Sequence, residues 1–227
     1  AAILGRNLAR LEETAALLAA RGALVKSLAC DVRERATVDL AFERAHEAFG
    51  PLSVLVANTG VGGPNDDGPR DRWDEIVRTN LDGAYFCLRA AARHLPEGAA
   101  EGCHLVAISS ILGRIGVAGY TAYCASKAGL LGLVRALAME LAPRRVQVNA
   151  VCPGWVETDM ARAGLEGMAQ GLGIALDEAR RLALAEVPLG RMSAPEDVAG
   201  LVAWLVSPDA RGVTGQGLDI NGGAFMI

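Results

Sequence analysis

Cysteine and histidine are too scattered in this sequence to build a metal centre or a disulfide framework. The 227 residues include five cysteines and three histidines. No two cysteines have Cys-x-x-Cys spacing, and the histidines lack the spacing of metal ligands. The sequence therefore predicts no metal site, and reduced thiols in a cytoplasmic protein. The residues concerned are Cys30, Cys87, Cys103, Cys124, Cys152, His46, His94 and His104.

An excess of positive charge and long apolar runs are also lacking. The net charge is −4 and the pI is about 5.5, which argues against a surface for nucleic acid or for an anionic membrane. No apolar stretch is long enough to span a bilayer, and no targeting segment is visible. The length and the composition, with 52% hydrophobic and 21% charged residues, predict a single domain over residues 1–227. Such a domain has one large core.

The sequence does contain an alternation of short apolar segments and amphipathic ones. Strands are predicted at 1–4, 24–28, 54–57, 104–108, 146–152 and 217–220. Helices are predicted at 8–20, 36–49, 73–94, 120–141 and about 195–205, the last with Ser193 as N-cap, Pro195 near its first position and Glu196 at its third. This alternation predicts an α/β fold, a three-layer Rossmann-type doubly wound parallel sheet with helices on both faces.

Tyr123 and Lys127 give the strongest functional signal, because a spacing of four brings both side chains to one face of a helix. The chain has only three tyrosines and two lysines, so chance hardly explains the pair. An ammonium beside a phenol favours phenolate, so we expect the pKa of Tyr123 to fall from about 10 toward neutral pH. Ser110 follows a predicted strand, which places its hydroxyl where ligands bind in open α/β sheets.

Further motifs follow in order along the chain. They are Asp31-Val32, Asn58-Thr59-Gly60, Asn80, Ser110, Tyr123 with Lys127, the run 149–158 and Asp219-Ile220-Asn221-Gly222-Gly223. From end to end the chain resembles the short-chain dehydrogenase/reductase family, which moves a hydride between a nicotinamide and a carbonyl carbon. The resemblance implies four catalytic residues. Tyr123 would exchange the proton, Ser110 would hold the carbonyl oxygen, Lys127 would bind the nicotinamide ribose, and Asn80 would hold a water that links Lys127 to solvent.

The end of the first predicted strand, Gly5-Arg6, bears on the choice of cofactor. Family members that prefer NAD usually carry an acidic residue there, whereas Arg6 can pair with a 2′-phosphate. The resemblance therefore favours NADP(H), with NAD(H) as the alternative. Besides Tyr123 and Lys127, it implies adenine contacts at Asp31 and Val32, close backbone approach at Asn58 and Gly60, and carboxamide and phosphate contacts at Pro153, Gly154, Val156 and Thr158.

The strand and glycine-rich turn with which family members begin are not in this sequence, which starts at the equivalent of the second strand. In the family topology that first strand lies in the middle of the sheet, so its absence would leave two unpaired edges. We expect a leading segment of roughly 30 residues, the size of a βα unit with its turns. Gly60-Val61-Gly62-Gly63 and Gly222-Gly223 are not substitutes, since neither opens a βαβ unit.

Residues 159–187 are expected to form a substrate lid, made mobile by Gly164, Gly167, Gly171 and Gly173, with a short helix at 176–184. In length the lid resembles those of polyketide ketoreductases, and the chain's last residues resemble those of 3-oxoacyl-carrier-protein reductases. A 3-oxoacyl thioester or a related ketone is therefore the expected substrate. Two alternatives stay open: an NAD-dependent secondary-alcohol dehydrogenase, and a catalytically idle subunit or scaffold.

The expected assembly is a homotetramer built from the helices at 73–94 and 120–141 and from the C-terminal strand. The second helix carries apolar or small residues on nearly every side, more than one contact with a sheet would use. These residues are Ala125, Leu130, Leu131, Leu133, Val134, Leu137, Ala138 and Leu141. The apolar tail 224–227 is likewise expected to dock against a neighbouring subunit.

Overall fold

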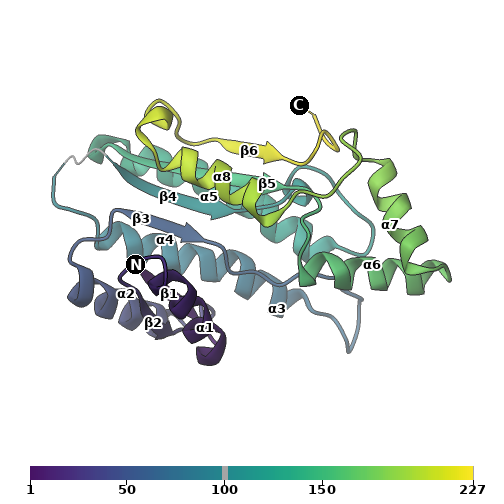
Figure 1. Cartoon of the computed structure of the whole chain (residues 1–227), viewed down its shortest axis with the longest axis horizontal. Helices are drawn as coiled ribbons and strands as arrows, with labels where there is room; N and C mark the ends of the chain where they lie inside the picture. The colour runs from purple at the N-terminus through teal and green to yellow at the C-terminus, as the bar shows by residue number, and fades with distance from the viewer. Residues whose placement is uncertain (99–101, 227) are drawn as a thin grey trace.

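The computed structural model describes residues 1–98 and 102–226, in which parallel strands alternate with helices (Figure 1). The strands are β1 Ala2–Gly5, β2 Lys26–Ala29, β3 Val54–Ala57, β4 Cys103–Ile108, β5 Val146–Pro153 and β6 Gly217–Ile220. The α-helices are α1 Leu8–Ala19, α2 Arg35–Phe49, α3 Trp73–Val77, α4 Gly83–Arg93, α5 Thr121–Leu141, α6 Asp159–Leu172, α7 Leu176–Ala185 and α8 Pro195–Leu205. Shorter helices are the π-helix η1 Arg78–Asp82 and the 3₁₀ helices η2 Ile111–Gly113, η3 Ala142–Arg144 and η4 Pro208–Ala210.

The strands form two hydrogen-bonded groups. One is the pair β1-β2 and the other has the order β3-β4-β5-β6, with every pairing parallel. Among the described residues, β1 and β3 each pair on one side only. Val54 and Val56 of β3 are accordingly 47% and 40% exposed, although a strand in the middle of a sheet would bury them.

Successive side chains of the central strands point to opposite faces of the sheet and belong to different hydrophobic cores. Each face is therefore covered by its own layer of helices. Leu105 of β4 and Val148 of β5 join a large core with helices α2, α4 and α5. Val106 and Val151, their neighbours on the opposite face, pack against α8. In Figure 1 the helices α4 and α8 accordingly lie on either side of the central strands. The predicted doubly wound parallel α/β fold is confirmed.

The predicted helix 73–94 is not continuous. A π-helix, η1, separates α3 from α4 and contains Asn80, which is fully buried. A π-turn widens the helix by one residue and turns the side chains before and after it to different faces. The helix restarts at Gly83, where an added Cβ would come within 2.6 Å of Val32 Cγ2, so only glycine fits that contact.

The predicted bounds of the helix at 195–205 are confirmed, but the predicted N-cap is wrong by one residue. The N-cap is Ala194 and not Ser193, and Pro195 occupies the first helical position. Asp197 takes the third position instead of Glu196, and its carboxylate accepts a hydrogen bond from Ala194 N at 2.9 Å. The physical element expected there, a carboxylate that returns to the N-cap amide, is thus present but shifted along the chain.

The region 159–187 consists largely of two regular helices, α6 and α7. Helix α6 runs through Gly164, Gly167 and Gly171 and ends at Gly173, whose φ of 66° is left-handed. Packing of α6 against α7 offsets the poor helix propensity of those glycines. The expected helix at 176–184 is found as α7. Figure 1 shows α6 and α7 beyond the carboxyl ends of the strands.

Helix α5 uses most of its apolar surface inside its own chain. Of the eight residues expected to leave a second face for a partner, six are buried within this protomer: Leu130, Leu131, Val134, Leu137, Ala138 and Leu141. The reason is that α5 contacts β5, α3, η1 and η2, so several of its sides are covered. What stays exposed is a row of small residues, Ala125, Gly132 and Ala136, with Met139 at 78% exposure.

Among the described residues, no helix combines the length and the apolar character needed to cross a bilayer. Within the same ranges, no group of three or more His, Cys, Asp or Glu side chains is placed to hold a metal. All five cysteines are free, and four of them are buried.

Candidate active site

Tyr123 and Lys127 lie in the first two turns of α5, on the side that faces the end of β4. Lys127 is 5% exposed, and its Nζ donates a hydrogen bond to the Ile108 carbonyl at 2.8 Å. The same nitrogen lies 5.6 Å from the centroid of the Tyr123 ring. The spacing of four residues therefore brings phenol and ammonium together, as the helical pattern predicted.

Two consecutive serines attach the end of β4 to α5. Ser109 Oγ donates to the carbonyl of Lys127 at 2.8 Å. Ser110 is buried, accepts from Leu112 N at 3.1 Å as the cap of η2, and hydrogen-bonds the Tyr123 phenol. Gly113 lets the turn lie against the Lys127 carbonyl, because an added Cβ would come within 2.8 Å of that oxygen. Strand, turn and helix thus form one rigid unit around the phenol.

The environment of Tyr123 contradicts the expected direction of its pKa. Burial raises the pKa of Tyr123 above its ordinary value, and the hydrogen bond with Ser110 offsets part of that rise. Burial also lowers the pKa of Lys127 to about 8, against a smaller opposing effect of the Cys152 thiol. The expectation failed because burial, the largest influence on the phenol, outweighs any effect of the nearby ammonium. Near neutral pH the site therefore presents a protonated phenol, which is the form that donates a proton.

Asn80 is buried next to these residues, but its side chain supports backbone. Oδ1 accepts from Val61 N at 2.8 Å, and Nδ2 donates to Val61 O at 2.9 Å and to Ser126 Oγ at 3.2 Å. Ser126 Oγ in turn donates to the carbonyl of Tyr123 at 2.8 Å. Asn80 therefore holds the loop after β3 beside α5, and its Oδ1 keeps a second lone pair that can accept a further hydrogen bond.

The loop after β3 comes close to the site through Gly60. A Cβ on Gly60 would stand 3.4 Å from Asn80 Oδ1 and 3.5 Å from Lys127 Nζ. Asn58 precedes this approach at the end of β3. The backbone of Asn58-Thr59-Gly60 is thus open to a flat ligand bound over the strand ends, because no side chain stands at Gly60.

The other side of the site is formed by the end of β5 and the start of α6. Pro153 closes β5, and Gly154 N donates to the Ile220 carbonyl at 3.1 Å. Val156 pairs with Ser193 in an isolated parallel bridge. Thr158 is the N-cap of α6, with its Oγ1 accepting from Ala161 N at 3.3 Å. A helix N-terminus with a hydroxyl beside it suits the phosphate of a ligand.

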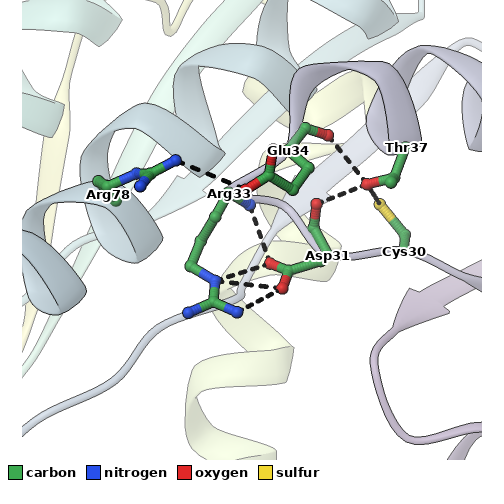
Figure 2. A network of polar contacts seen from close by, with 6 residues as sticks. All are labelled: Cys30, Asp31, Arg33, Glu34, Thr37 and Arg78. Carbon is green, nitrogen blue, oxygen red and sulfur yellow. Dashed lines mark hydrogen bonds and ion pairs between the residues drawn. The ribbon is translucent and has the colours of Figure 1, made fainter.

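The residues predicted for adenine and for the 2′-phosphate lie at the ends of β1 and β2. Figure 2 shows Arg33 wrapped around the Asp31 carboxylate, with Nε to Oδ1 at 3.0 Å and Nη2 to Oδ2 at 2.6 Å. The Arg33 hydrogen bond holds the pKa of Asp31 down at about 2, and Arg6 contributes electrostatically. Arg6 itself is exposed. Val32 is buried in the core against Gly83, so it supports this turn from beneath.

Figure 2 also shows how the turn that carries Asp31 is fixed. Thr37 Oγ1 donates to the carbonyls of Asp31, at 2.6 Å, and of Glu34, at 2.9 Å. Glu34 pairs with Arg78 of η1 at 3.5 Å. The first turn of α2 therefore joins the end of β2 to the π-helix that carries Asn80.

Sequence reasoning missed several supporting residues. Arg33 is one, and the spacing Asp-x-Arg directly after a predicted strand could have signalled its pairing. Arg114 is another: it donates to Asp219 at 3.3 Å and to the Gly217 carbonyl at 2.6 Å, joining the turn after η2 to β6. The two partners of Arg114 lie 105 and 103 residues away, so no local pattern indicates its contacts.

Comparison with known proteins identifies the family of this chain. A family model described as Enoyl-(Acyl carrier protein) reductase matches residues 2–224. The chain belongs to the short-chain dehydrogenase/reductase family. It is therefore an oxidoreductase that acts on CH–OH groups or the corresponding carbonyls, as the sequence predicted.

Three relatives illustrate the range of this family. The chain is 35% identical over 212 residues to a 3-oxoacyl-acyl-carrier-protein reductase of Salmonella typhimurium, covering 91% of this chain and 80% of the relative. It is 37% identical over 211 residues to an L-rhamnose 1-dehydrogenase (NAD(P)+) of Azotobacter vinelandii, covering 92% and 78%. A crystal structure of an actinorhodin polyketide ketoreductase with NADPH matches with a TM-score of 0.91 and 35% identity, covering 98% and 86%.

Proposed function

We propose that this protein reduces a ketone, preferably a 3-oxoacyl thioester, to a secondary alcohol with NADPH. The observation that carries the proposal is the buried group at the end of β4, where the protonated Tyr123 phenol lies against Ser110 and next to Lys127. The names of two relatives, a 3-oxoacyl reductase and a polyketide ketoreductase, support the same reaction.

In this proposal each residue of the group has one task. Ser110 donates a hydrogen bond to the substrate carbonyl oxygen and orients it. Tyr123 gives its phenolic proton to that oxygen as negative charge develops there. Lys127 stays protonated near neutral pH and binds the ribose hydroxyls of the cofactor. Asn80 holds the Val61 backbone and Ser126 in place beside α5.

The residues around this group fit a dinucleotide. The space left by Gly60 adjoins Lys127 Nζ, and the start of α6 presents Thr158 to a phosphate. We assign the carboxamide and phosphates to Pro153, Gly154, Val156 and Thr158, the backbone approach to Asn58 and Gly60, adenine to the turn of Asp31 and Val32, and the 2′-phosphate to Arg6. When bound, the nicotinamide supplies the hydride.

The substrate lid is assigned to α6 and α7. A cavity of about 400 Å³ lies between these helices and the segment after Val156. Its lining mixes apolar side chains, such as Leu165 and Met192, with the ion pair of Arg180 and Glu157. Such a lining suits a substrate that has both an apolar part and polar groups, as a 3-oxoacyl thioester does.

A second candidate is an NAD-dependent dehydrogenase of a secondary alcohol, which would use the same Tyr123 and Lys127. The observation in its favour is the 37% identity to an L-rhamnose 1-dehydrogenase. The exposed Arg6 at the end of β1 favours NADPH over NAD, because an arginine pairs with the 2′-phosphate that NAD lacks.

The test is steady-state reduction of a 3-oxoacyl thioester by the wild-type protein with NADPH and with NADH. We expect a higher kcat/KM with NADPH than with NADH. We also expect Tyr123→Phe to lower kcat by about 10² to 10⁴ while NADPH binding stays intact. Turnover of Tyr123→Phe within tenfold of wild type would contradict the assignment. Oxidation of a secondary alcohol with NAD alone would select the second candidate, and no turnover of any carbonyl or alcohol would select an idle scaffold.

We further propose a cytoplasmic homotetramer. The exposed small residues Ala125, Gly132 and Ala136 on α5 allow close approach of a second helix, and the exposed Met139 and Tyr85 lie on α5 and α4. Met226 near the C-terminus is 74% exposed, and Ile227 lies outside the described residues. Light scattering at micromolar concentration should give four times the protomer mass, and a monomeric mass would contradict the proposal.

A further inference from the structure

Asn65 holds the start of α5 from a different part of the chain. It lies in the loop between β3 and α3, 57 residues before Ala122. Its Oδ1 accepts hydrogen bonds from Ala122 N at 2.9 Å and from Thr121 Oγ1 at 3.0 Å. Its backbone N donates to the carbonyl of Gly119 at 2.9 Å. One residue thus makes hydrogen bonds to three residues at the start of α5, Gly119, Thr121 and Ala122.

Helix α5 has little else to satisfy its first turn. Its N-cap residue, Tyr120, makes no side-chain cap, and the first turn contains no acidic residue. The first N–H groups of a helix have no partner within the helix, and an oxygen from elsewhere stabilises them. Oδ1 of Asn65 supplies that oxygen to Ala122, the residue directly before Tyr123.

A second hydrogen bond fixes which way the Asn65 amide points. Nδ2 donates to Asp71 Oδ1 at 3.4 Å, which leaves Oδ1 directed at α5. Asp71 Oδ1 also accepts from Trp73 N at 3.0 Å and so holds the start of α3. Asn65 and Asp71 together join the starts of two helices, α3 and α5, that pack against each other.

We propose that Asn65 is a positioning residue, which keeps Tyr123 in register with Ser110 by capping α5 through Ala122. The inference rests on the proposed function, since Tyr123 is the proton donor there. Without Oδ1 of Asn65 the first turn of α5 opens more often, and Tyr123 moves with it. Lys127 is one turn further along and is tied to the Ile108 carbonyl, so its position is retained.

The experiment compares Asn65→Ala with wild type in three measurements. We expect kcat for ketone reduction to fall roughly tenfold, which corresponds to a lost cap that misplaces one group, while KM for NADPH stays within about twofold. We expect faster hydrogen exchange at the Ala122 and Tyr123 amides. Ser207→Ala is the matched control: Ser207 Oγ accepts from Asp209 N at 3.3 Å and caps η4, which carries no proposed site residue. Its kcat should equal that of wild type.

The double variant Asn65→Asp with Asp71→Asn separates positioning from general loss of structure. It exchanges the carboxylate and the amide, so an acceptor oxygen still faces Ala122 and the mutual hydrogen bond is retained. The hydrogen bond from Trp73 N is lost, because Asp71 Oδ1 accepts from Asn65 and from Trp73 with the same atom, so hydrogen exchange at Ala122 and Tyr123 is the readout specific to α5. We expect it to restore at least half of the lost kcat. Unchanged kcat and unchanged exchange in Asn65→Ala, or failure of the double variant to restore either, would overturn the proposal. If wild type reduces no ketone, the proposed function fails, and the exchange measurements still decide the role of Asn65.

Discussion

The N-terminal pair of strands and the two inner strands of the four-stranded sheet, β4 and β5, differ sharply in how well they are covered. Every residue of β1 is only partly buried, and α1 has no buried residue at all. In β5, by contrast, seven of eight residues are buried, and α5 buries nine of its residues against the sheet and its neighbours. The two regions have the same parallel βα architecture, so the difference lies in the packing around them.

This difference separates two tasks. The residues proposed for proton transfer, Ser110, Tyr123 and Lys127, belong to the well-covered region, where packing fixes their positions to fractions of an ångström. Arg6 and Asp31, proposed for the adenosine end of the cofactor, belong to the exposed region. A charge that recognises a phosphate acts over a longer range than a proton donor does, so its placement is less exacting.

The largest expected effect tests the packing difference itself. Leu105 of β4 is 1% exposed and Leu17 of α1 is 71% exposed. Leu105→Ala should lower the free energy of unfolding by about 2–5 kcal/mol, because it removes buried methyl groups and leaves a cavity. Leu17→Ala should change it by less than about 0.5 kcal/mol. Urea denaturation of both variants measures this, and equal losses would show that α1 is covered in solution.

The next effect concerns the function of the exposed region. If Arg6 pairs with the 2′-phosphate, Arg6→Ala should raise KM for NADPH by roughly tenfold or more and leave KM for NADH within about twofold. Arg21, just beyond α1, provides a matched control because it is also an exposed arginine of the same region. Arg21→Ala should change neither constant. A similar rise of both constants in Arg6→Ala would identify Arg6 as an ordinary surface cation.

The smallest effect is a titration within the same region. Arg33 holds the pKa of Asp31 at about 2, so the folded state favours the carboxylate, and this contribution to stability is present above about pH 4 and lost as the pH falls through 2. Arg33→Ala should return the Asp31 pKa toward 3.8. Carboxyl NMR titration measures the shift, with Arg35→Ala as control because Arg35 pairs with Asp39 instead. An unchanged pKa in Arg33→Ala would show that the ion pair of Figure 2 does not persist in solution.

Most of the fold could be predicted from the sequence, because apolar periodicity and glycine or proline breaks mark most elements. The bounds predicted for β3 and β6 match the structure. The π-helix η1 could not be predicted, since one extra residue within a long apolar pattern leaves the 3.6-residue period nearly unchanged. Helix α6 was not predicted for a different reason: its packing against α7 overrides the poor helix propensity of three glycines.

The candidate site also has features that local sequence predicts and features that it does not. Tyr123 and Lys127 are four residues apart in one helix, so their meeting follows from local geometry alone. The direction of the Tyr123 pKa does not, because burial depends on the whole fold around it. Asn65 and Arg114 were invisible for the same reason, as each acts through hydrogen bonds to residues more than fifty positions away.

Because of the π-helix η1, the position of Asn80 depends on the number of residues in this segment. Removing one residue from Arg78–Asp82 would let α3 and α4 run as one ordinary α-helix, and α3 would rotate by about 100° relative to α4. Asn80 would then lose either the Val61 backbone or Ser126, although no amino acid of the site had been exchanged. The exposed stretch 66–70 before α3 can change length without altering that phase, so insertions and deletions there leave the angular setting of Asn80 intact.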